Sequence, residues 1–169
     1  MDVASKTVQP AVLWPILGGI FIILANAFFV AVEFAIVTVR RGPLERLAAK
    51  GNPSAKLVVH LLRDPDWAIA GAQLGITVAS ILLGIVAEEP LKHLLEPGLT
   101  RLFSQVPFLD ALATALATLI VLLILTFLHM VLGEQVPKTI ALRFPQNSAL
   151  VIARPMSLFA RLASPLVWV

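Results

Sequence analysis

The stretch His129–Pro145, HMVLGEQVPKTIALRFP, interrupts a long apolar run and guides the interpretation of the whole chain. It places Gly133, Glu134, Pro137 and Lys138 where a membrane helix should meet water. An ionisable group at membrane depth is a functional-site hypothesis by default. Pro137 lacks a backbone donor and clashes with the carbonyl four residues before it, so we expect a helix break. The freed carbonyl beside a carboxylate suits a hard cation.

The composition around this stretch is that of a membrane protein. Of 169 residues, 59% are hydrophobic and 14% are charged, whereas a soluble domain carries about a quarter charged residues. A bilayer core needs about 20 apolar residues per helix, and three runs of 26, 21 and 23 residues contain no Asp, Glu, Lys or Arg. The sequence therefore predicts an all-α integral membrane protein, in one domain over 1–169, with spanning helices over about 11–39, 67–88 and 110–133.

Two other segments predict amphipathic juxtamembrane helices. Arg40–Arg63 holds six Lys or Arg against one acidic residue, with leucines at helical spacing and a break at Gly51-Asn52-Pro53. The positive-inside rule places this loop in the cytoplasm and the amino terminus outside. We expect the juxtamembrane helices over about 42–63 and 147–169. The chain stops at Val169 in mid-pattern, so we expect a cytoplasmic segment to follow it.

The second predicted span has boundary signals on both sides. Asp64 precedes Pro65 and predicts the N-cap of the helix. Beyond the span, Glu88–Pro107 has no excess of positive charge and contains Pro90, Pro97 and Pro107. We expect this segment to be an outside loop broken by the prolines.

Polar and small residues recur at helical spacing inside the first two spans. Asn26 and Glu33 lie two helical turns apart, nearly on one face. Gly71 and Gly75 form a small-xxx-small pair that lets a neighbouring helix come close. A polar seam follows on one face of the second span and is made of Gln73, Thr77 and Ser80.

Each of these polar residues also has a structural interpretation. Asn26 can make a plain interhelical hydrogen bond, worth about 0.6 kcal/mol in a membrane, and the hydroxyls of the seam can bond back to their own helix. Glu33 can reach toward Arg40, and Glu134 can pair with Lys138 one turn later. We interpret His129 as a packed histidine rather than a ligand, since no HExxH pattern is present.

The available donors favour a hard cation. The chain has no cysteine, and carboxylate, amide, hydroxyl and carbonyl oxygens suit Mg²⁺ or Ca²⁺ better than zinc. Na⁺ would fit the same oxygens. The formal net charge of +3 resides in the loops between spans, where topology explains it, so we do not infer nucleic-acid binding.

Three motifs resemble one known family. NAFFVAVEFA (Asn26–Ala35), QLGIT (Gln73–Thr77) and GEQVPKTIALRFP (Gly133–Pro145) are similar to the membrane domain of the CorC/CNNM magnesium transporters, also called DUF21. The motifs fall in all three predicted spans and in the family's order, and GE-x-x-PK is the most specific of them. The resemblance covers essentially the whole chain.

This resemblance implies a fold of three transmembrane helices and a belt of cytoplasmic juxtamembrane helices. It implies a homodimer in the plasma (inner) membrane, a multi-pass topology, and a following pair of cytoplasmic CBS domains that binds ATP. The implied activity is Mg²⁺ export with Na⁺ as counter-ion, and no enzyme activity.

The resemblance also implies a set of metal ligands. The Gly133 main-chain oxygen and the Glu134 carboxylate match the family motif directly, whereas Gln73 and Thr77 stand where relatives often have Asn. Many relatives have Ser where this chain has Val30. That departure makes Asn26, or a main-chain carbonyl near Phe28–Val30, the substitute ligand. Ser80 and Glu33 are secondary candidates.

The sequence thus predicts a magnesium transporter whose helices rock about the Gly71 and Gly75 contact and the Pro137 break. Two other classes stay open. One is a membrane-embedded regulator or sensor that binds Mg²⁺ without transporting it. The other is an intramembrane hydrolase using His129 and Glu134, which is the weakest because the chain lacks a nucleophile–base pattern.

Overall fold

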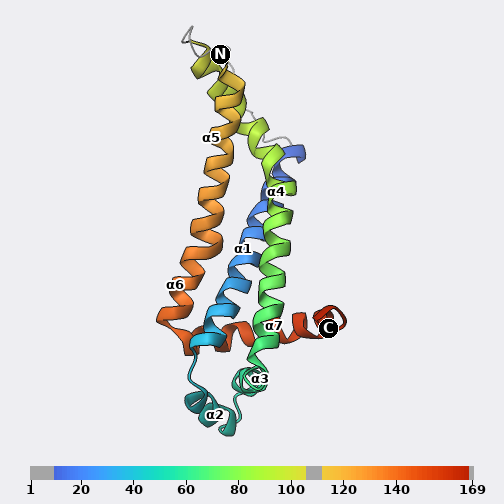
Figure 1. Cartoon of the computed structure of the whole chain (residues 1–169), viewed down its shortest axis with the longest axis vertical. Helices are drawn as coiled ribbons and strands as arrows, with labels where there is room; N and C mark the ends of the chain where they lie inside the picture. Colours follow the sequence, from blue (N-terminus) through green and yellow to red (C-terminus); the bar gives the residue numbers. More distant parts are fainter. Residues whose placement is uncertain (1–9, 106–111, 168–169) are drawn as a thin grey trace.

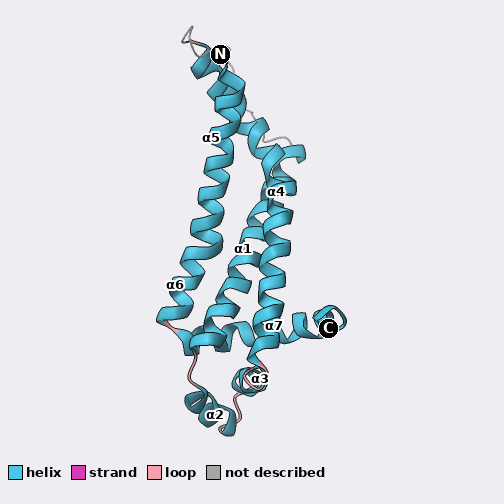
Figure 2. Cartoon of the chain, in the orientation of Figure 1, coloured by secondary structure: helices cyan, strands magenta, loops and turns pink. Residues whose placement is uncertain are grey.

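The computed structural model describes residues 10–105 and 112–167, and every regular element in these ranges is helical (Figures 1 and 2). The elements are α1 (Pro10–Thr38), α2 (Arg41–Ala49), α3 (Pro53–Leu61), α4 (Pro65–Ser104), α5 (Ala113–Leu128), the π-helical turn η2 (His129–Gln135), α6 (Val136–Arg143) and α7 (Pro145–Val167). The long helices α1, α4 and α5 run side by side, and α7 crosses their lower end in Figure 1.

Three stretches of the described chain are long and apolar enough to cross a membrane: Leu13–Thr38, Pro65–Phe103 and Ala113–Arg143. This confirms the prediction of three spanning helices in an all-α fold. Helix α4 packs against both α1 and α5, as expected for spans that alternate in direction and are consecutive in the chain. Pro107 and the predicted start of the third span near residue 110 lie outside the described residues.

The prediction of an outside loop after residue 88 is wrong, because α4 continues to Ser104 through Pro90 and Pro97. Its 40 residues give a length of about 60 Å, twice the hydrocarbon thickness of about 30 Å. Helical ion pairs stabilise the second half, with Lys92 Nζ 2.7 Å from Glu88 and 3.6 Å from Glu89. Outside the bilayer, water can satisfy the carbonyls that the prolines leave free, which explains why the helix survives them.

The juxtamembrane segments form a belt at one end of the bundle, here called the belt end and made of α2, α3 and α7. Helices α2 and α3 are separated by a turn at Gly51, whose φ of 91° favours glycine, so the predicted break is confirmed. The Asn52 side chain accepts a hydrogen bond from the Ala55 amide at 3.0 Å and caps α3. Asp64 caps α4 as predicted, accepting from the Trp67 amide at 3.2 Å.

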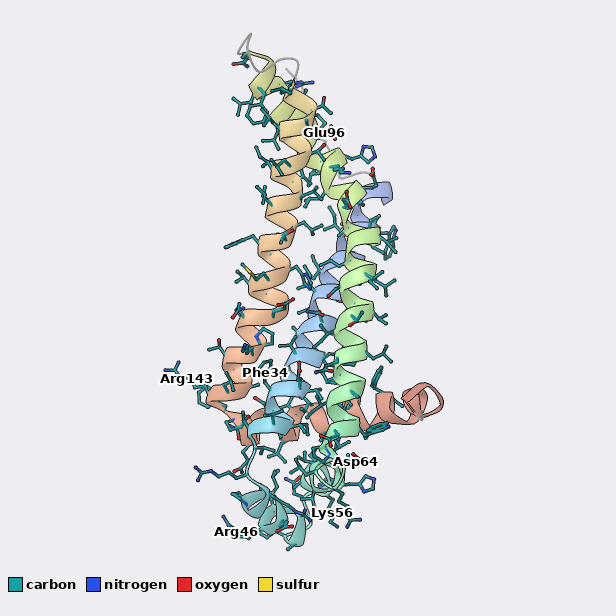
Figure 3. The ribbon with its side chains drawn as sticks, viewed as in Figure 1. Phe34, Arg46, Lys56, Asp64, Glu96 and Arg143 are labelled. Carbon is teal, nitrogen blue, oxygen red and sulfur yellow. The ribbon has the colours of Figure 1, made fainter. Side chains whose placement is uncertain are left out.

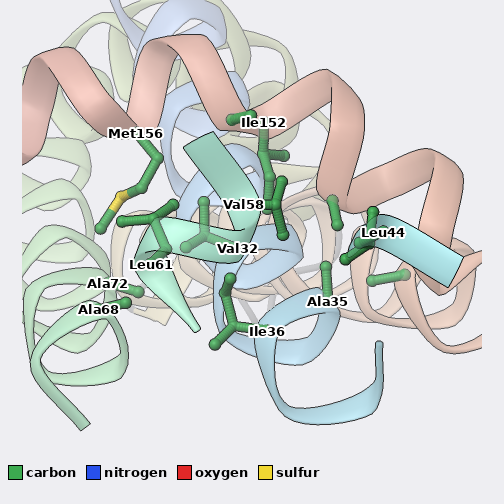
Figure 4. Packing of buried hydrophobic residues seen from close by; sticks show 13 residues of the cluster. Val32, Ala35, Ile36, Leu44, Val58, Leu61, Ala68, Ala72, Ile152 and Met156 are labelled. Atoms are coloured by element: carbon green, nitrogen blue, oxygen red, sulfur yellow. The ribbon is translucent and has the colours of Figure 1, made fainter. Parts of the chain in front are cut away.

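The main apolar core lies at the belt end, where α1, α2, α3, α4, α6 and α7 meet (Figure 4). Apolar side chains of the amphipathic helices supply half of it, and the ends of the spans supply the rest. The core consists of Val32, Ala35, Ile36, Leu44, Val58, Leu61, Ala68, Ala72, Ala141, Ala149, Ile152, Ala153 and Met156. Figure 3 shows the charged side chains of Arg46, Lys56 and Asp64 at this end and Glu96 toward the other.

Glycines bring α1 and α4 close together along the spans. A Cβ at Gly19 would lie 3.1 Å from the Ala87 Cβ, and a Cβ at Gly75 would lie 2.5 Å from the Phe29 ring. Gly75 therefore supports the predicted close helix contact. Gly71 instead faces the belt, because the nearest atoms to its Cβ position belong to Met156 and Phe159 of α7, at 3.6 Å.

Candidate functional site

Pro137 does not break the third span. The apolar helix α5 passes into the π-helical turn His129–Gln135 and continues as α6, so the span does not end at Gly133 as predicted. Pro137 lies in the first turn of α6, where a missing backbone donor is tolerated. Such π turns inside α-helices occur frequently at functional sites. The turn carries the predicted site residues Gly133 and Glu134.

The carbonyl of Gly133 is turned toward α1, where it meets a buried amide. Asn26 Nδ2 donates a hydrogen bond to the Gly133 oxygen at 3.1 Å, and Asn26 has no exposed surface. Pro137, four residues after Gly133, has no N–H to offer that oxygen. The carbonyl is therefore available to a side chain from another span, as the sequence predicts.

Gly133 has no side chain at the point where two other side chains converge. A Cβ there would lie 2.8 Å from His129 Cδ2, 3.2 Å from Asn26 Nδ2 and 3.4 Å from His129 Nε2. Asn26, His129 and Gly133 thus form one polar contact group between α1 and η2, here called the Gly133 notch. Any larger residue at position 133 would force these groups apart.

Two polar atoms of the notch are buried and find no hydrogen-bond partner within the described chain: Asn26 Oδ1 and His129 Nε2. The orientation of the Asn26 amide follows from its contact, because the Gly133 carbonyl can only accept, so the nitrogen must face it. Buried polar atoms are satisfied in the great majority of native structures. Two exceptions among neighbouring side chains make the notch a candidate site for a polar or cationic group.

Glu134 follows the notch directly and is half-buried. The salt bridges found among the described residues do not include it, so the pair with Lys138 that was the structural alternative is not formed. Lys138 Nζ lies 4.6 Å from the centroid of the Phe34 ring on α1, a cation–π contact. The carboxylate of Glu134 is thus not neutralised by its helical neighbour.

A second polar group connects α1 and α4. Gln73 Nε2 donates to Glu33 Oε1 at 3.1 Å, so Glu33 pairs across the helices rather than reaching Arg40. Thr77 Oγ1 donates to the Gln73 carbonyl at 2.9 Å, which is the bond back to its own helix considered above. The structure therefore brings Glu33 and Gln73 together, about two turns from Asn26.

Ser80 is half-buried on α4. The antiparallel register of α1 and α4, between the Gly19–Ala87 and Phe29–Gly75 contacts, places Asn26 level with Ala79 and Ser80. Asn26 also lies near the middle of α1. The Gly133 notch therefore lies near the middle of the candidate span Leu13–Thr38, and transporters commonly bind their substrates near the middle of their spans.

The notch and Glu134 offer amide, carbonyl and carboxylate oxygens. These are ligands for hard cations. No group of three or more His, Asp or Glu side chains that could hold a metal occurs in residues 10–105 and 112–167, which disfavours a site built from carboxylates and imidazoles alone.

Two cavities lie elsewhere. A cavity of about 420 Å³ between α1 and α4 is lined by apolar residues, including Phe21, Phe29, Leu74 and Phe159, and offers no cation ligands. Another, of about 430 Å³, lies between the far half of α4 and the start of α5 and includes Lys92, Glu96 and Arg101. The positively charged side chains of Lys92 and Arg101 disfavour a cation in this second cavity, and the first cavity lacks ligands. Neither cavity is therefore a better cation site than the Gly133 notch.

His129 is the one notch residue that sequence reasoning assigned to packing. Its spacing from Gly133, four residues on a helix, places the two on the same face and was a usable signal. That its buried Nε2 atom has no hydrogen-bond partner in the described chain could only be recognised once α1 was in place.

The fold and the site together define a polytopic helical membrane domain with the polar Gly133 notch between its spans. The model of the CNNM family, described as the cyclin M transmembrane N-terminal domain, matches residues 17–169, and the chain belongs to this family. The family is associated with Mg²⁺ transport and is a transporter-type domain, not a known enzyme family.

Curated relatives show the same likeness. The chain is 40% identical to the UPF0053 protein YhdT of Bacillus subtilis (strain 168) over 91% of its length and 32% of the relative's. It is 39% identical to the uncharacterized protein Rv1841c of Mycobacterium tuberculosis (strain H37Rv), over 92% and 43%. The UPF0053 protein YhdP of Bacillus subtilis is 37% identical over 87% and 32%. The chain thus spans about a third to two fifths of these relatives.

Proposed function

We propose that this chain is the membrane domain of a magnesium transporter that exports Mg²⁺ in exchange for Na⁺. The observation that carries the proposal is the buried Asn26 amide. Its nitrogen donates to the carbonyl of Gly133, the residue directly before Glu134 in the sequence, and its oxygen meets no donor in the described residues. A cation bound there would satisfy the amide oxygen and neutralise the acid.

In this proposal the primary ligands are Glu134, Asn26 and the Gly133 carbonyl, which has a second lone pair beyond the one used by Asn26. Thr77, which is exposed, and Ser80, which is half-buried, lie on α4 near the same level as Asn26 and are further candidate ligands. Gln73 and Glu33, which bond to each other, form a second binding position for the ion on its way toward the belt end. Rocking of α4 against α1 at the Gly75–Phe29 contact, with the π turn before Pro137, would open the site alternately to each side.

Binding is tested by isothermal titration of the purified chain in detergent with MgCl₂. We expect Glu134→Gln to weaken Mg²⁺ binding by about tenfold or more. Glu89→Gln is the matched control, since Glu89 is an exposed carboxylate and such groups contribute only about 0–1 kcal/mol through their ion pairs. Unchanged Mg²⁺ affinity in Glu134→Gln would remove Glu134 from the site.

Transport is tested in proteoliposomes loaded with Mg²⁺, with and without an inward Na⁺ gradient. Efflux that depends on the gradient supports exchange, and efflux that ignores it rejects the coupling to Na⁺. Mg²⁺ binding without any efflux would favour the alternative function, a membrane-embedded magnesium sensor.

Orientation is a further part of the proposal. We place the domain in a bacterial plasma (inner) membrane, with the amino terminus outside and the belt end on the cytoplasmic side. The chain contains no cysteine, so single introduced cysteines are clean accessibility probes. We expect Lys50→Cys, in the belt, to be protected from an impermeant thiol reagent in intact cells, and His93→Cys, on the far half of α4, to react. The reverse pattern would invert the topology.

The proposed assembly is a homodimer whose chain continues into cytoplasmic CBS domains that bind ATP. The support is the family membership together with the relatives' greater length. Crosslinking of the longer protein in membranes tests the dimer, and ATP titration of its soluble part tests the CBS domains.

A further inference from the structure

His129 differs from an ordinary packed histidine in one respect. Its ring is half-buried, but its Nε2 atom is inaccessible and lies without a hydrogen-bond partner among the residues that the structure describes. A histidine packed for structure normally has each ring nitrogen bonded to a protein group or water. The chain therefore buries an imidazole nitrogen without a described partner, and such burial lowers the stability of the fold.

The nitrogen lies against the Gly133 backbone, beside the Asn26 amide. His129 Nε2 and Asn26 Nδ2 lie within 3.4 Å and 3.2 Å of the same point, the position that a Cβ of residue 133 would occupy. The two side chains come from different spans, α5–η2 and α1, and approach the Gly133 backbone together. The Gly133 notch also contains the second buried atom without a described partner, Asn26 Oδ1.

We propose that His129 Nε2 is a further ligand of the ion site and that this nitrogen sets the preference of the site between Mg²⁺ and borderline divalent cations such as Mn²⁺ and Co²⁺. The inference rests on the proposed function, because the oxygen ligands are those given above. Oxygen donors suit Mg²⁺ and Mn²⁺, whereas imidazole favours later transition metals, and affinity for a mixed nitrogen and oxygen site rises from Mn²⁺ to Co²⁺. One nitrogen among oxygens should raise Co²⁺ and Mn²⁺ affinity more than Mg²⁺ affinity.

The test is titration of the purified chain with MgCl₂, MnCl₂ and CoCl₂, comparing wild type with His129→Leu. We expect Co²⁺ and Mn²⁺ affinity to fall by about tenfold or more and Mg²⁺ affinity to change by less than about threefold. His93→Leu is the matched control, because His93 is exposed on the far half of α4. Its three affinities should equal those of wild type.

A structural role of His129 predicts something different, namely equal losses for all three ions, and that result would overturn the inference. Unchanged affinities would do the same, since they would mean that the nitrogen binds only water. His129→Gln, which is smaller and polar, provides a second variant if His129→Leu fails to fold. It should show the same selective loss.

Pulsed electron paramagnetic resonance of bound Mn²⁺ gives a direct readout. We expect coupling to a ¹⁴N nucleus in wild type and its disappearance in His129→Gln. Glu134→Gln separates this inference from the proposed function. If Glu134→Gln lowers the affinity for all three ions while the His129 variants leave the affinities unchanged, the oxygen site stands and the nitrogen ligand is rejected. If wild type binds none of the ions, both are rejected.

Discussion

The belt-end core and the Gly133 notch are both buried and share helix α1, but they are built from opposite chemistry. Val32, Ala35 and Ile36 of α1 pack among apolar side chains from five other elements. Two turns earlier, Asn26 is equally inaccessible, yet its oxygen meets no donor in the described parts of the chain. Apolar burial stabilises a fold, whereas burial of a polar atom without a partner costs free energy.

The difference suggests a division of roles within one helix bundle. The core joins the belt to the spans and holds the fold together, while the notch is kept at a cost in stability for binding. Changes in the core should therefore alter stability without altering ion affinity, whereas changes in the notch should alter ion affinity. The following predictions test this separation, beginning with the largest effect.

Leu44→Ala should produce the largest loss of stability. Leu44 is a large, fully buried side chain of α2 in the belt-end core, and deletion of such a side chain costs about 2–5 kcal/mol. Thermal unfolding in detergent measures the loss, and Mg²⁺ titration at a temperature where the variant is folded should give the wild-type affinity. Val151→Ala, at a residue 77% exposed on α7, is the control and should change the unfolding free energy by about 0.5 kcal/mol or less. A parallel loss of affinity in Leu44→Ala would contradict the separation.

Gly133→Ala should come next and should affect both properties. The new Cβ would meet His129 Cδ2 at 2.8 Å and Asn26 Nδ2 at 3.2 Å, and overpacking of this kind costs about 1–3 kcal/mol. Because the shifted groups are the proposed ligands, Mg²⁺ affinity should fall as well.

Gly84→Ala is the matched control for this variant. A Cβ at Gly84 would meet no described atom within 4 Å, and alanine is favoured over glycine in a helix by about 0.5–1 kcal/mol. We expect equal or higher stability and unchanged affinity. Similar behaviour of the two glycine variants would show that the notch has no special packing.

Asn26→Leu should separate the two properties most sharply. The substitution removes the amide oxygen and also the donor to the Gly133 carbonyl. Hydrogen bonds between membrane helices average about 0.6 kcal/mol, so the thermal stability should change little. Mg²⁺ affinity, measured by titration, should fall by about tenfold or more. Wild-type affinity in a folded Asn26→Leu variant would limit Asn26 to a structural role.

Asn52→Ala should give the smallest effect, confined to the belt. The side chain caps α3 through the Ala55 amide, and loss of such a cap costs about 1 kcal/mol. Melting temperature should fall slightly while the ion affinity remains that of wild type. Asn52→Ser should restore most of the lost stability, since serine is also a good N-cap, and failure of this rescue would assign the loss to packing instead.

Much of the candidate site could be predicted from the sequence, because its signals are local. Pro137 determines that the Gly133 carbonyl lacks its helical donor, and an asparagine in an apolar span has to face protein. The pairings were less predictable. Glu33 bonds to Gln73 rather than Arg40, and Lys138 covers Phe34 rather than pairing with Glu134. These choices depend on which helix lies alongside, and local spacing carries no such information.

The amino-acid order alone was enough for the three spans, the N-cap Asp64, the break at Gly51-Asn52-Pro53, and the polar stretch around Glu134. Hydropathy, helix caps and proline chemistry all act within a few residues along the chain. Packing between distant segments decided the rest: the route of α4 through its prolines, the π turn, and the meeting of Asn26 with Gly133 and His129. The last contact joins residues more than a hundred positions apart, so only the folded bundle could bring a buried nitrogen and a buried amide to one point.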